Sequence, residues 1–262
     1  MRREVWVTGA SSGIGKETAL LLAQNGHSPV LVARSSKKLA EVSAYIYEQS
    51  GYQPSFFACD ITKEKDRSQL IKWIQDNNYS PDVLINNAGY GVFQEIEQID
   101  MHTAEETFQV NVLGGIALVN NLLPFLKESN QGHIINVVSQ AGKLPTPKSA
   151  VYAASKHAML AYTNVLRMEV GNHVYVTAVN YGPVKTPFLQ KADPSGGYEE
   201  AVGRWLISPS TAAEHIARAV DKPKREVNLP RWMNIAAFFY SLSPRFVETL
   251  SKPLFMKKIN RR

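Results

Sequence analysis

The chain has 262 residues, of which 44% are hydrophobic and 20% are charged, and its formal net charge is +6. These values are typical of a single globular α/β domain that can bury a large core. Cys59 is the one cysteine, which excludes an internal disulfide and indicates a reducing compartment. The N-terminal segment lacks the apolar stretch of a secretory signal, and no run reaches the roughly 18 apolar residues of a membrane-spanning helix. We therefore expect a cytoplasmic protein.

The net positive charge lies in the last 41 residues of the chain. Residues 222–262 contain ten Lys or Arg and two Asp or Glu, whereas residues 1–221 contain 19 basic and 21 acidic residues. The body of the protein therefore lacks the basic surface that nucleic-acid binding requires. A basic nucleic-acid module would rest on the tail alone, and we expect no nucleic-acid partner.

Short apolar runs alternate with longer amphipathic segments along the chain. The amphipathic segments lie near 16–26, 37–49, 63–77, 103–126, 151–170 and 210–220, and the apolar runs are Val5–Val7, Val30–Ala33, Phe56–Ala58, Val83–Ile85, Ile134–Val138 and Tyr175–Val179. This alternation predicts a doubly wound parallel sheet with helices on both faces, in one domain over residues 1–262. The Gly-, Pro- and Ser-rich part at 193–210 is interpreted as a loop.

The first apolar run leads into a turn rich in glycine and serine. In Thr8-Gly9-Ala10-Ser11-Ser12-Gly13-Ile14-Gly15 the glycines follow the spacing G-x3-G-x-G. Glycine lets the backbone approach a pyrophosphate closely, and the N-terminus of the following helix offers free N–H groups to the anion. The turn therefore predicts a dinucleotide site, with the contacts made by Gly9, Ser11, Ser12, Gly13, Ile14 and Gly15.

The end of the second apolar run bears on which nicotinamide cofactor binds. Folds that bind NAD place an acidic residue about 20 positions after the glycine turn, where it accepts a bond from the ribose 2′-hydroxyl. Here Arg34 lies 19 residues after Gly15, followed by Ser35, and no carboxylate is present to repel a 2′-phosphate. Since a guanidinium binds phosphate in a forked geometry, Arg34 and Ser35 favour NADP(H).

A series of motifs and single residues carries a family resemblance when its members are taken together. TGASSGIG, Asp60, the Asn86-Asn87-Ala88-Gly89 segment, Asn111, Ser139 and the Tyr152-Ala153-Ala154-Ser155-Lys156 segment follow one another in this order. The chain resembles the short-chain dehydrogenase/reductase family in its compact form, strongly over residues 4–190 and weakly over 191–262. The resemblance implies a Rossmann-like fold and a set of cofactor contacts at Asp60, Ile61, Asn87, Ala88, Gly89, Gly182, Val184 and Thr186. Tyr181 departs from the family pattern, because proline is usual there.

Tyr152 and Lys156 lie four residues apart and so share one face of a helix. The phenol of a free tyrosine has a pKa near 10. A fixed ammonium and a cationic nicotinamide ring beside it would lower that value, so Tyr152 can act as general acid in reduction or as general base in oxidation. The resemblance implies that the Ser139 hydroxyl bonds the substrate oxygen. It also implies that Asn111 holds a water that extends the proton relay from Lys156, and that Tyr152 and Lys156 contact the cofactor.

These residues predict an NADP(H)-dependent oxidoreductase that exchanges hydride between nicotinamide and a carbonyl or alcohol carbon, reducing an apolar ketone or aldehyde. One alternative is an NAD-linked alcohol dehydrogenase, against which Arg34 argues. The other is a non-catalytic NADP-binding sensor or scaffold, which has no need of Ser139 and Tyr152 together. We assign no metal site. The family resemblance implies a homodimer or homotetramer formed through segments 103–126 and 151–170.

Two C-terminal parts of the chain bear on the substrate. The segment 185–205 is interpreted as a substrate-side loop, and the apolar wall residues are expected to be Tyr90, Val92, Phe93, Leu144, Phe188, Leu189 and Tyr198. In the basic tail, 230–262, helical spacing joins Trp232, Ile235, Phe239 and Leu242, and an apolar stripe continues after Pro244 through Phe246 and Leu250. We favour a tail packed over the active site or on a second subunit. The alternative is peripheral contact with an anionic membrane at its inner surface.

Overall fold

The computed structural model describes residues 2–259, and for residue 204 and residues 252–259 it describes the backbone only. Seven parallel strands form one sheet in the order β3-β2-β1-β4-β5-β6-β7. The order reverses direction between β1 and β4, which creates the crevice where doubly wound folds bind ligands. The strands are β1 (Glu4–Thr8), β2 (Ser28–Ala33), β3 (Phe56–Ala58), β4 (Val83–Asn86), β5 (His133–Val137), β6 (Tyr175–Tyr181) and β7 (Glu226–Leu229).

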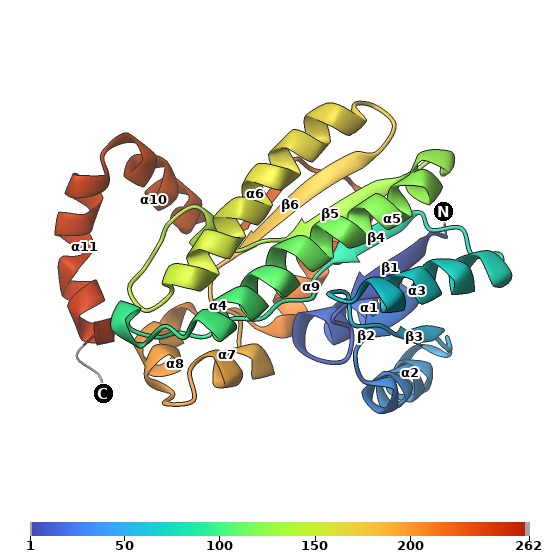
Figure 1. Cartoon of the computed structure of the whole chain (residues 1–262), viewed down its shortest axis with the longest axis horizontal. Helices are drawn as coiled ribbons and strands as arrows, with labels where there is room; N and C mark the ends of the chain where they lie inside the picture. Colours follow the sequence, from blue (N-terminus) through green and yellow to red (C-terminus); the bar gives the residue numbers. More distant parts are fainter. Residues whose placement is uncertain (1, 260–262) are drawn as a thin grey trace.

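Two hydrophobic clusters bury the two faces of the sheet. Val5 and Val7 belong to one cluster and Trp6 to the other, because successive residues of a strand point to opposite faces. Both faces are covered, and the strands therefore appear as continuous apolar runs. One face packs against α1 (Gly13–Gln24), α2 (Ser36–Ser50) and α9 (Pro209–Asp221), and the other against α3 (Glu64–Asp76), α5 (Gly115–Glu128) and α6 (Ala150–Val170). Figure 1 shows α5 and α6 running across one face.

The six expected apolar runs all form strands, and the expected doubly wound parallel sheet is confirmed. The seventh strand, β7, was not expected, because its sequence Glu226-Val227-Asn228-Leu229 carries only two apolar residues. It pairs with β6 at the edge of the sheet, where polar side chains are tolerated.

The segment 103–126, expected to be one helix, contains a change of helical type. It begins as α4 (Met101–Phe108), continues as a π-helical turn over Gln109–Gly114, and ends as α5. A β-carbon at Gly115 would lie 2.9 Å from Asn86 Nδ2, so the glycine lets the helix approach β4 closely. Such π-helical turns occur frequently at functional sites.

The run Met101–Glu128 is long and apolar enough to cross a membrane by length and composition, and it is the one such run in the described part of the chain. This corrects the expectation that no segment passes that test. However, 44% of its apolar window is buried, and Leu118, Leu122 and Leu126 belong to a core cluster of the sheet. The run is therefore accounted for as a core helix.

The segment expected as a loop at 193–210 is partly helical. It follows α7 (Pro187–Ala192) and contains α8 (Gly197–Val202) and a 3-10 turn over Gly203–Trp205. The Asp193 carboxylate organises the turn before α8 by accepting bonds from the backbone N–H groups of Ser195 and Tyr198. The tail forms α10 (Arg231–Leu242) and α11 (Pro244–Ile259), which confirms the helical spacing. Figure 1 shows these helices at the end of the molecule opposite α2 and α3.

Candidate active site

A cavity of about 460 Å³ opens at the carboxyl ends of the strands. Its wall comes from the turns that follow β1 to β6, together with residues of α6, α7 and α8 and one residue of α10. The expected site residues line this cavity, with the exceptions of Gly15 and Asn111. The parallel sheet therefore gathers side chains from distant parts of the sequence at one edge, as the doubly wound topology requires.

The glycine turn forms the floor of the cavity before α1. Gly9 and Gly13 have φ angles of +66° and +54°, which side chains rarely adopt. Gly15 is buried beneath the turn, and a β-carbon there would lie 2.5 Å from the carbonyl oxygen of Gly9. Gly15 therefore permits close packing of α1 and makes no direct contact with the cavity. The Ser12 side chain caps none of the first N–H groups of α1, so these groups remain available to an anion.

Thr8 joins the turns after β1 and β4. Its hydroxyl accepts hydrogen bonds from the backbone N–H groups of Asn87 at 2.9 Å and Ala88 at 3.0 Å. The Asn87 amide in turn donates to the Thr8 carbonyl oxygen at 2.9 Å. These bonds fix the Asn87-Ala88-Gly89 backbone against the glycine turn, on the side of the cavity where a dinucleotide would bind.

Basic side chains lie at the end of β2. Arg34 and Lys38 both line the cavity and are exposed. The Ser35 hydroxyl accepts a bond from Lys38 N and so begins α2. Asp60, which also lines the cavity, accepts bonds from the backbone N–H and the hydroxyl of Thr62. The positive charge of Arg34 and Lys38 is suited to a phosphate ester.

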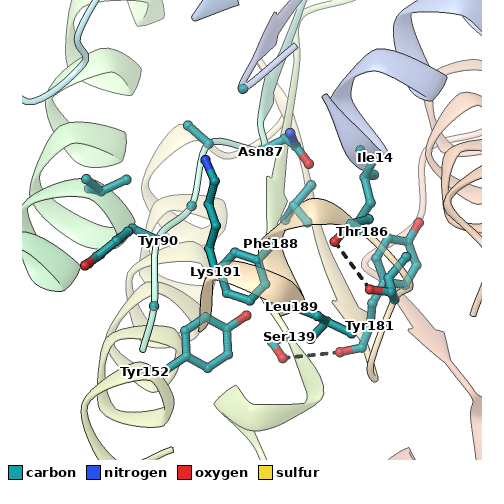
Figure 2. Close-up of a pocket in the computed structure, with 18 of the residues that line it drawn as sticks. Ile14, Asn87, Tyr90, Ser139, Tyr152, Tyr181, Thr186, Phe188, Leu189 and Lys191 are labelled. Atoms are coloured by element: carbon teal, nitrogen blue, oxygen red, sulfur yellow. Dashed lines mark hydrogen bonds between the residues drawn. The ribbon is translucent and has the colours of Figure 1, made fainter. Parts of the chain in front are cut away.

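The Ser139 hydroxyl and the Tyr152 phenol face each other across the cavity. Ser139 follows β5, and its hydroxyl donates to the Tyr181 carbonyl oxygen at 3.2 Å and accepts from Ala141 N at 3.0 Å. Tyr152 comes from α6, and Figure 2 shows its hydroxyl pointing toward Ser139. The Lys156 ammonium, one turn along α6, donates to the Val137 carbonyl oxygen at 3.1 Å. The structure thus brings the three expected residues together.

The protonation of this pair differs from the sequence-based expectation. Burial raises the pKa of the Tyr152 phenol to about 12, and a hydrogen bond with the Ser139 side chain opposes this increase only in part. Burial also lowers the pKa of the Lys156 ammonium to about 8. The Lys156 nitrogen lies 5.7 Å from the centre of the Tyr152 ring, and burial remains the largest influence on the pKa of the phenol. The protein alone therefore keeps Tyr152 as a proton donor.

Asn111 is fully engaged by neighbouring groups within the π-helical turn. Its amide oxygen accepts from the backbone N–H of Tyr90 at 2.8 Å, and its amide nitrogen donates to the Tyr90 carbonyl oxygen at 2.7 Å and to the Ser155 hydroxyl at 3.0 Å. The side chain thus clamps the segment after β4 to α6. That Asn111 holds a water of a proton relay stays a prediction.

The segment Asn180–Thr186 closes the cavity from the β6 side. Tyr181, which stands where the family has proline, is buried, and its hydroxyl donates to the Ala212 carbonyl oxygen of α9 at 2.5 Å. The phenol thus anchors β6 to α9, and the following residues remain in the wall. Gly182, Val184 and Thr186 all line the cavity, as expected.

An aromatic cluster forms the outer wall. The ring of Phe93 lies 5.8 Å from that of Tyr152 and 4.6 Å from that of Tyr198, and the rings of Tyr152 and Phe188 are 5.6 Å apart. Tyr90, Leu144 and Leu189 also line the cavity as expected. The expectation for Val92 was wrong, because its side chain lines a separate small cavity. Successive side chains of the extended segment after β4 point in opposite directions.

Among the wall residues that were not anticipated from the sequence are Gly91, Lys191 and Met233. Gly91 is in contact with Tyr152, since a β-carbon there would lie 2.6 Å from Tyr152 Cδ2. Met233 reaches the cavity from α10, and Lys191 reaches it from α7. The helical spacing of the tail predicts an apolar face that does not include Met233. The sequence pattern therefore gave no signal for this side chain.

The comparisons with known proteins agree with this geometry. A family model described as short chain dehydrogenase matches residues 3–196. A fatty acyl-CoA reductase of Acinetobacter baylyi is 37% identical over 243 residues, 91% of this chain and 79% of the relative. A short-chain dehydrogenase of Sphingobium yanoikuyae, solved with NADPH, has a TM-score of 0.79 at 25% identity over 95% of both chains. A chain from Shigella flexneri, assigned as a short chain dehydrogenase and solved with NADP, has a TM-score of 0.78 at 28% identity, covering 86% of this chain and 94% of its own. From the glycine turn, the Ser139–Tyr152–Lys156 arrangement and these matches, we conclude that the chain belongs to the short-chain dehydrogenase family.

Proposed function

We propose that the protein is an NADP(H)-dependent oxidoreductase that reduces the carbonyl group of an apolar ketone or aldehyde to an alcohol. In this reaction the carbonyl carbon gains a hydride and its oxygen gains a proton, while NADPH becomes NADP⁺. The observation that carries the proposal is the placement of Ser139, Tyr152 and Lys156 around one cavity that also contains the glycine turn. When bound, NADPH supplies the hydride.

The residues of the cavity fit a dinucleotide carrying a 2′-phosphate. Glycine at position 9 lets the turn pack closely against the segment after β4, because a β-carbon there would lie 3.0 Å from Asn87 Nδ2. The free N–H groups of α1 face the cavity, and Arg34 and Lys38 would hold the phosphate on the adenosine ribose. Two related structures contain NADP or NADPH. The proposal is thus supported by local charge and by relatives together.

The chain's own residues account for the movement of the proton. The Ser139 hydroxyl would donate a hydrogen bond to the carbonyl oxygen of the substrate and position it beside Tyr152. The Tyr152 phenol, whose pKa of about 12 keeps it protonated at neutral pH, would donate its proton to the developing alkoxide. The Lys156 ammonium would then stabilise the phenolate that remains on Tyr152.

The cavity wall supports an apolar substrate. The Phe93 and Phe188 rings pack on the Tyr152 ring, and the Tyr198 ring packs on Phe93, so the wall beside the proton donor is aromatic. The relative from Acinetobacter baylyi is named for an apolar acyl substrate. We therefore include a fatty aldehyde among the carbonyl compounds that the protein is proposed to accept.

The experiment that tests this proposal follows the absorbance of NADPH in the presence of an apolar aldehyde, with NADH in a parallel assay. Turnover with NADPH, and much slower turnover with NADH, is the expected result. Faster oxidation of an alcohol with NAD⁺ than with NADP⁺ would instead identify an NAD-linked alcohol dehydrogenase. Tight NADPH binding without turnover of any carbonyl compound or alcohol would identify a sensor or scaffold.

A further inference from the structure

The C-terminal helices expose an unusual concentration of large apolar side chains. Among the described residues, fourteen large hydrophobic side chains are exposed, and half of them fall within residues 231–250. Their exposed fractions lie between 46% and 67%. We call this set the tail face, and it comprises Trp232, Ile235, Phe238, Phe239, Leu242, Phe246 and Leu250.

The orientation of α10 is the reverse of that in an ordinary surface helix. Its inner side carries Ala237, which is 6% exposed, and Asn234, whose side chain accepts a bond from Lys143 Nζ at 2.8 Å. Its outer side carries the Phe238 and Phe239 rings, and both are more than half exposed. A surface helix normally buries its bulkiest apolar residues. The small and polar residues of α10 hold it to the body, and the large apolar ones are left for another partner.

Positive charge accompanies the tail face. Arg231 and Arg245 are exposed at the first turns of α10 and α11, and ten of the 29 basic residues of the chain lie within residues 222–262 with only two acidic ones. The rest of the chain carries a slight excess of acidic residues. Bulky apolar side chains within a basic segment are the composition that binds the headgroup region of an anionic bilayer.

The tail face lies beside the mouth of the cavity. Met233, which follows Trp232 in the first turn of α10, lines the cavity. The Trp232 ring lies 5.7 Å from that of Trp205, in the 3-10 turn that follows α8. Figure 1 shows α11 returning toward α8, so that the two tail helices form an arch on the side of α7 and α8. A surface that the tail face touches is therefore close to the apolar entrance.

We propose that the tail face docks the protein on an anionic lipid bilayer and places the cavity mouth toward the membrane. Charge complementarity favours this occupant over a second copy of the chain. A two-fold contact between two tail faces would bring two segments of like charge together, whereas an anionic lipid surface would neutralise both. The docking goes beyond the proposed reaction, and its test does not depend on turnover.

Co-sedimentation with vesicles tests the proposal. The full chain is incubated with phosphatidylcholine vesicles and with vesicles that also contain phosphatidylglycerol. Wild type should bind the anionic vesicles and should be released by high salt. The double variant Ile235→Glu with Phe239→Glu should bind at least about tenfold more weakly, because it removes two apolar contacts and adds two negative charges.

A matched control separates the tail face from net charge. Tyr47→Glu with Met168→Glu makes the same charge change on exposed apolar residues of α2 and α6, away from the tail. This variant should bind vesicles within about twofold of wild type, a difference under 0.5 kcal/mol. Equal losses in both double variants would contradict the proposal. A wild-type chain that stays in the supernatant with anionic vesicles would also contradict the proposal. If that unbound wild type forms a larger assembly and the tail variant does not, the partner of the tail face is a second copy of the chain.

A second measurement does not depend on variants with added charge. Brominated lipids quench tryptophan fluorescence at short range. In a Trp205→Phe background, protein bound to anionic vesicles should be quenched, and adding Trp232→Phe should remove most of that effect, since the two remaining tryptophans, Trp6 and Trp73, pack together in a core cluster of the sheet. Fluorescence that brominated lipid leaves unchanged would contradict docking through α10.

Discussion

The Lys143 ammonium donates a hydrogen bond to Asn234 Oδ1 at 2.8 Å and so joins the turn behind Ser139 to helix α10. The same ammonium bonds the Glu226 carboxylate and the Asn228 side chain of β7. Burial raises the pKa of Glu226, but hydrogen bonds from Lys143 and Asn228 hold it below its ordinary value. Lys143 and Glu226 are 16% and 24% exposed, so solvent screens this pair only in part. The position of Ser139 is thus supported from the C-terminal helix.

Lys143→Met should lower kcat by about tenfold. The substitution removes the ammonium that anchors the turn holding the Ser139 hydroxyl, and it leaves the Glu226 carboxylate without its cation. The dissociation constant of NADPH should change by less than about twofold, a difference under 0.5 kcal/mol. Steady-state kinetics and a fluorescence titration of NADPH check the two parts. Lys143→Arg should recover most of kcat. A purely structural role is indicated if stability falls while kcat is unchanged.

Gly91→Ala should impair catalysis without impairing cofactor binding. The new β-carbon would lie 2.6 Å from Tyr152 Cδ2 and must displace the ring from Ser139. We expect kcat to fall at least about tenfold, since small errors in the position of a proton donor are costly. Gly203→Ala is the matched control, because nothing lies within 4 Å of its added β-carbon. Similar kinetics for both variants would show that the Tyr152 ring adapts.

Arg34→Ala should change the choice of cofactor. Without the guanidinium at the end of β2, the affinity for NADPH should fall by about tenfold or more, in line with the loss of a charge-assisted bond. The affinity for NADH should stay nearly constant, because it has no 2′-phosphate. Parallel titrations with both cofactors measure the ratio. An equal loss for NADH would show that Arg34 supports the fold of the turn and not the phosphate.

Lys156→Met should abolish turnover and yet stabilise the protein at neutral pH. Burial lowers the pKa of this ammonium from 10.5 to about 8, so the unfolded chain binds its proton more readily than the folded chain does. The resulting loss of stability is complete below pH 8 and disappears as the pH rises through 10.5. The variant should therefore gain about 3 kcal/mol at pH 7 and little at high pH. Thermal unfolding at both pH values measures the difference, and an equal gain at both would contradict this explanation.

The sequence was sufficient for the features that depend on local pattern. The continuous apolar runs predicted six strands, the spacing of Tyr152 and Lys156 predicted a shared helix face, and the family resemblance implied that Ser139 joins them. Features that depend on packing between distant segments were not predictable. The direction of Val92 and the approach of Gly91 to Tyr152 follow from how the segment after β4 lies on α6.

The tail illustrates the same limit. Its apolar spacing predicted a helix, but the pattern could not say whether Phe238 and Phe239 face the body or the solvent. The orientation of α10 follows from the hydrogen bond between Lys143 and Asn234 and from the burial of Ala237. Both depend on how α10 packs on the body of the protein. The expected homodimer or homotetramer stays a prediction.

In the proposed reaction, Tyr152 donates a proton to an apolar carbonyl compound while NADPH is oxidised. The most direct measurement is NADPH consumption against a graded series of aldehydes and ketones, from short aliphatic to steroid-sized, with wild type and Tyr152→Phe side by side. We predict that kcat/KM rises with apolar size and that Tyr152→Phe loses about 10²–10⁴ in rate while still binding NADPH. Equal rates for the two proteins, or no turnover of any compound by a wild type that binds NADPH, would contradict the account.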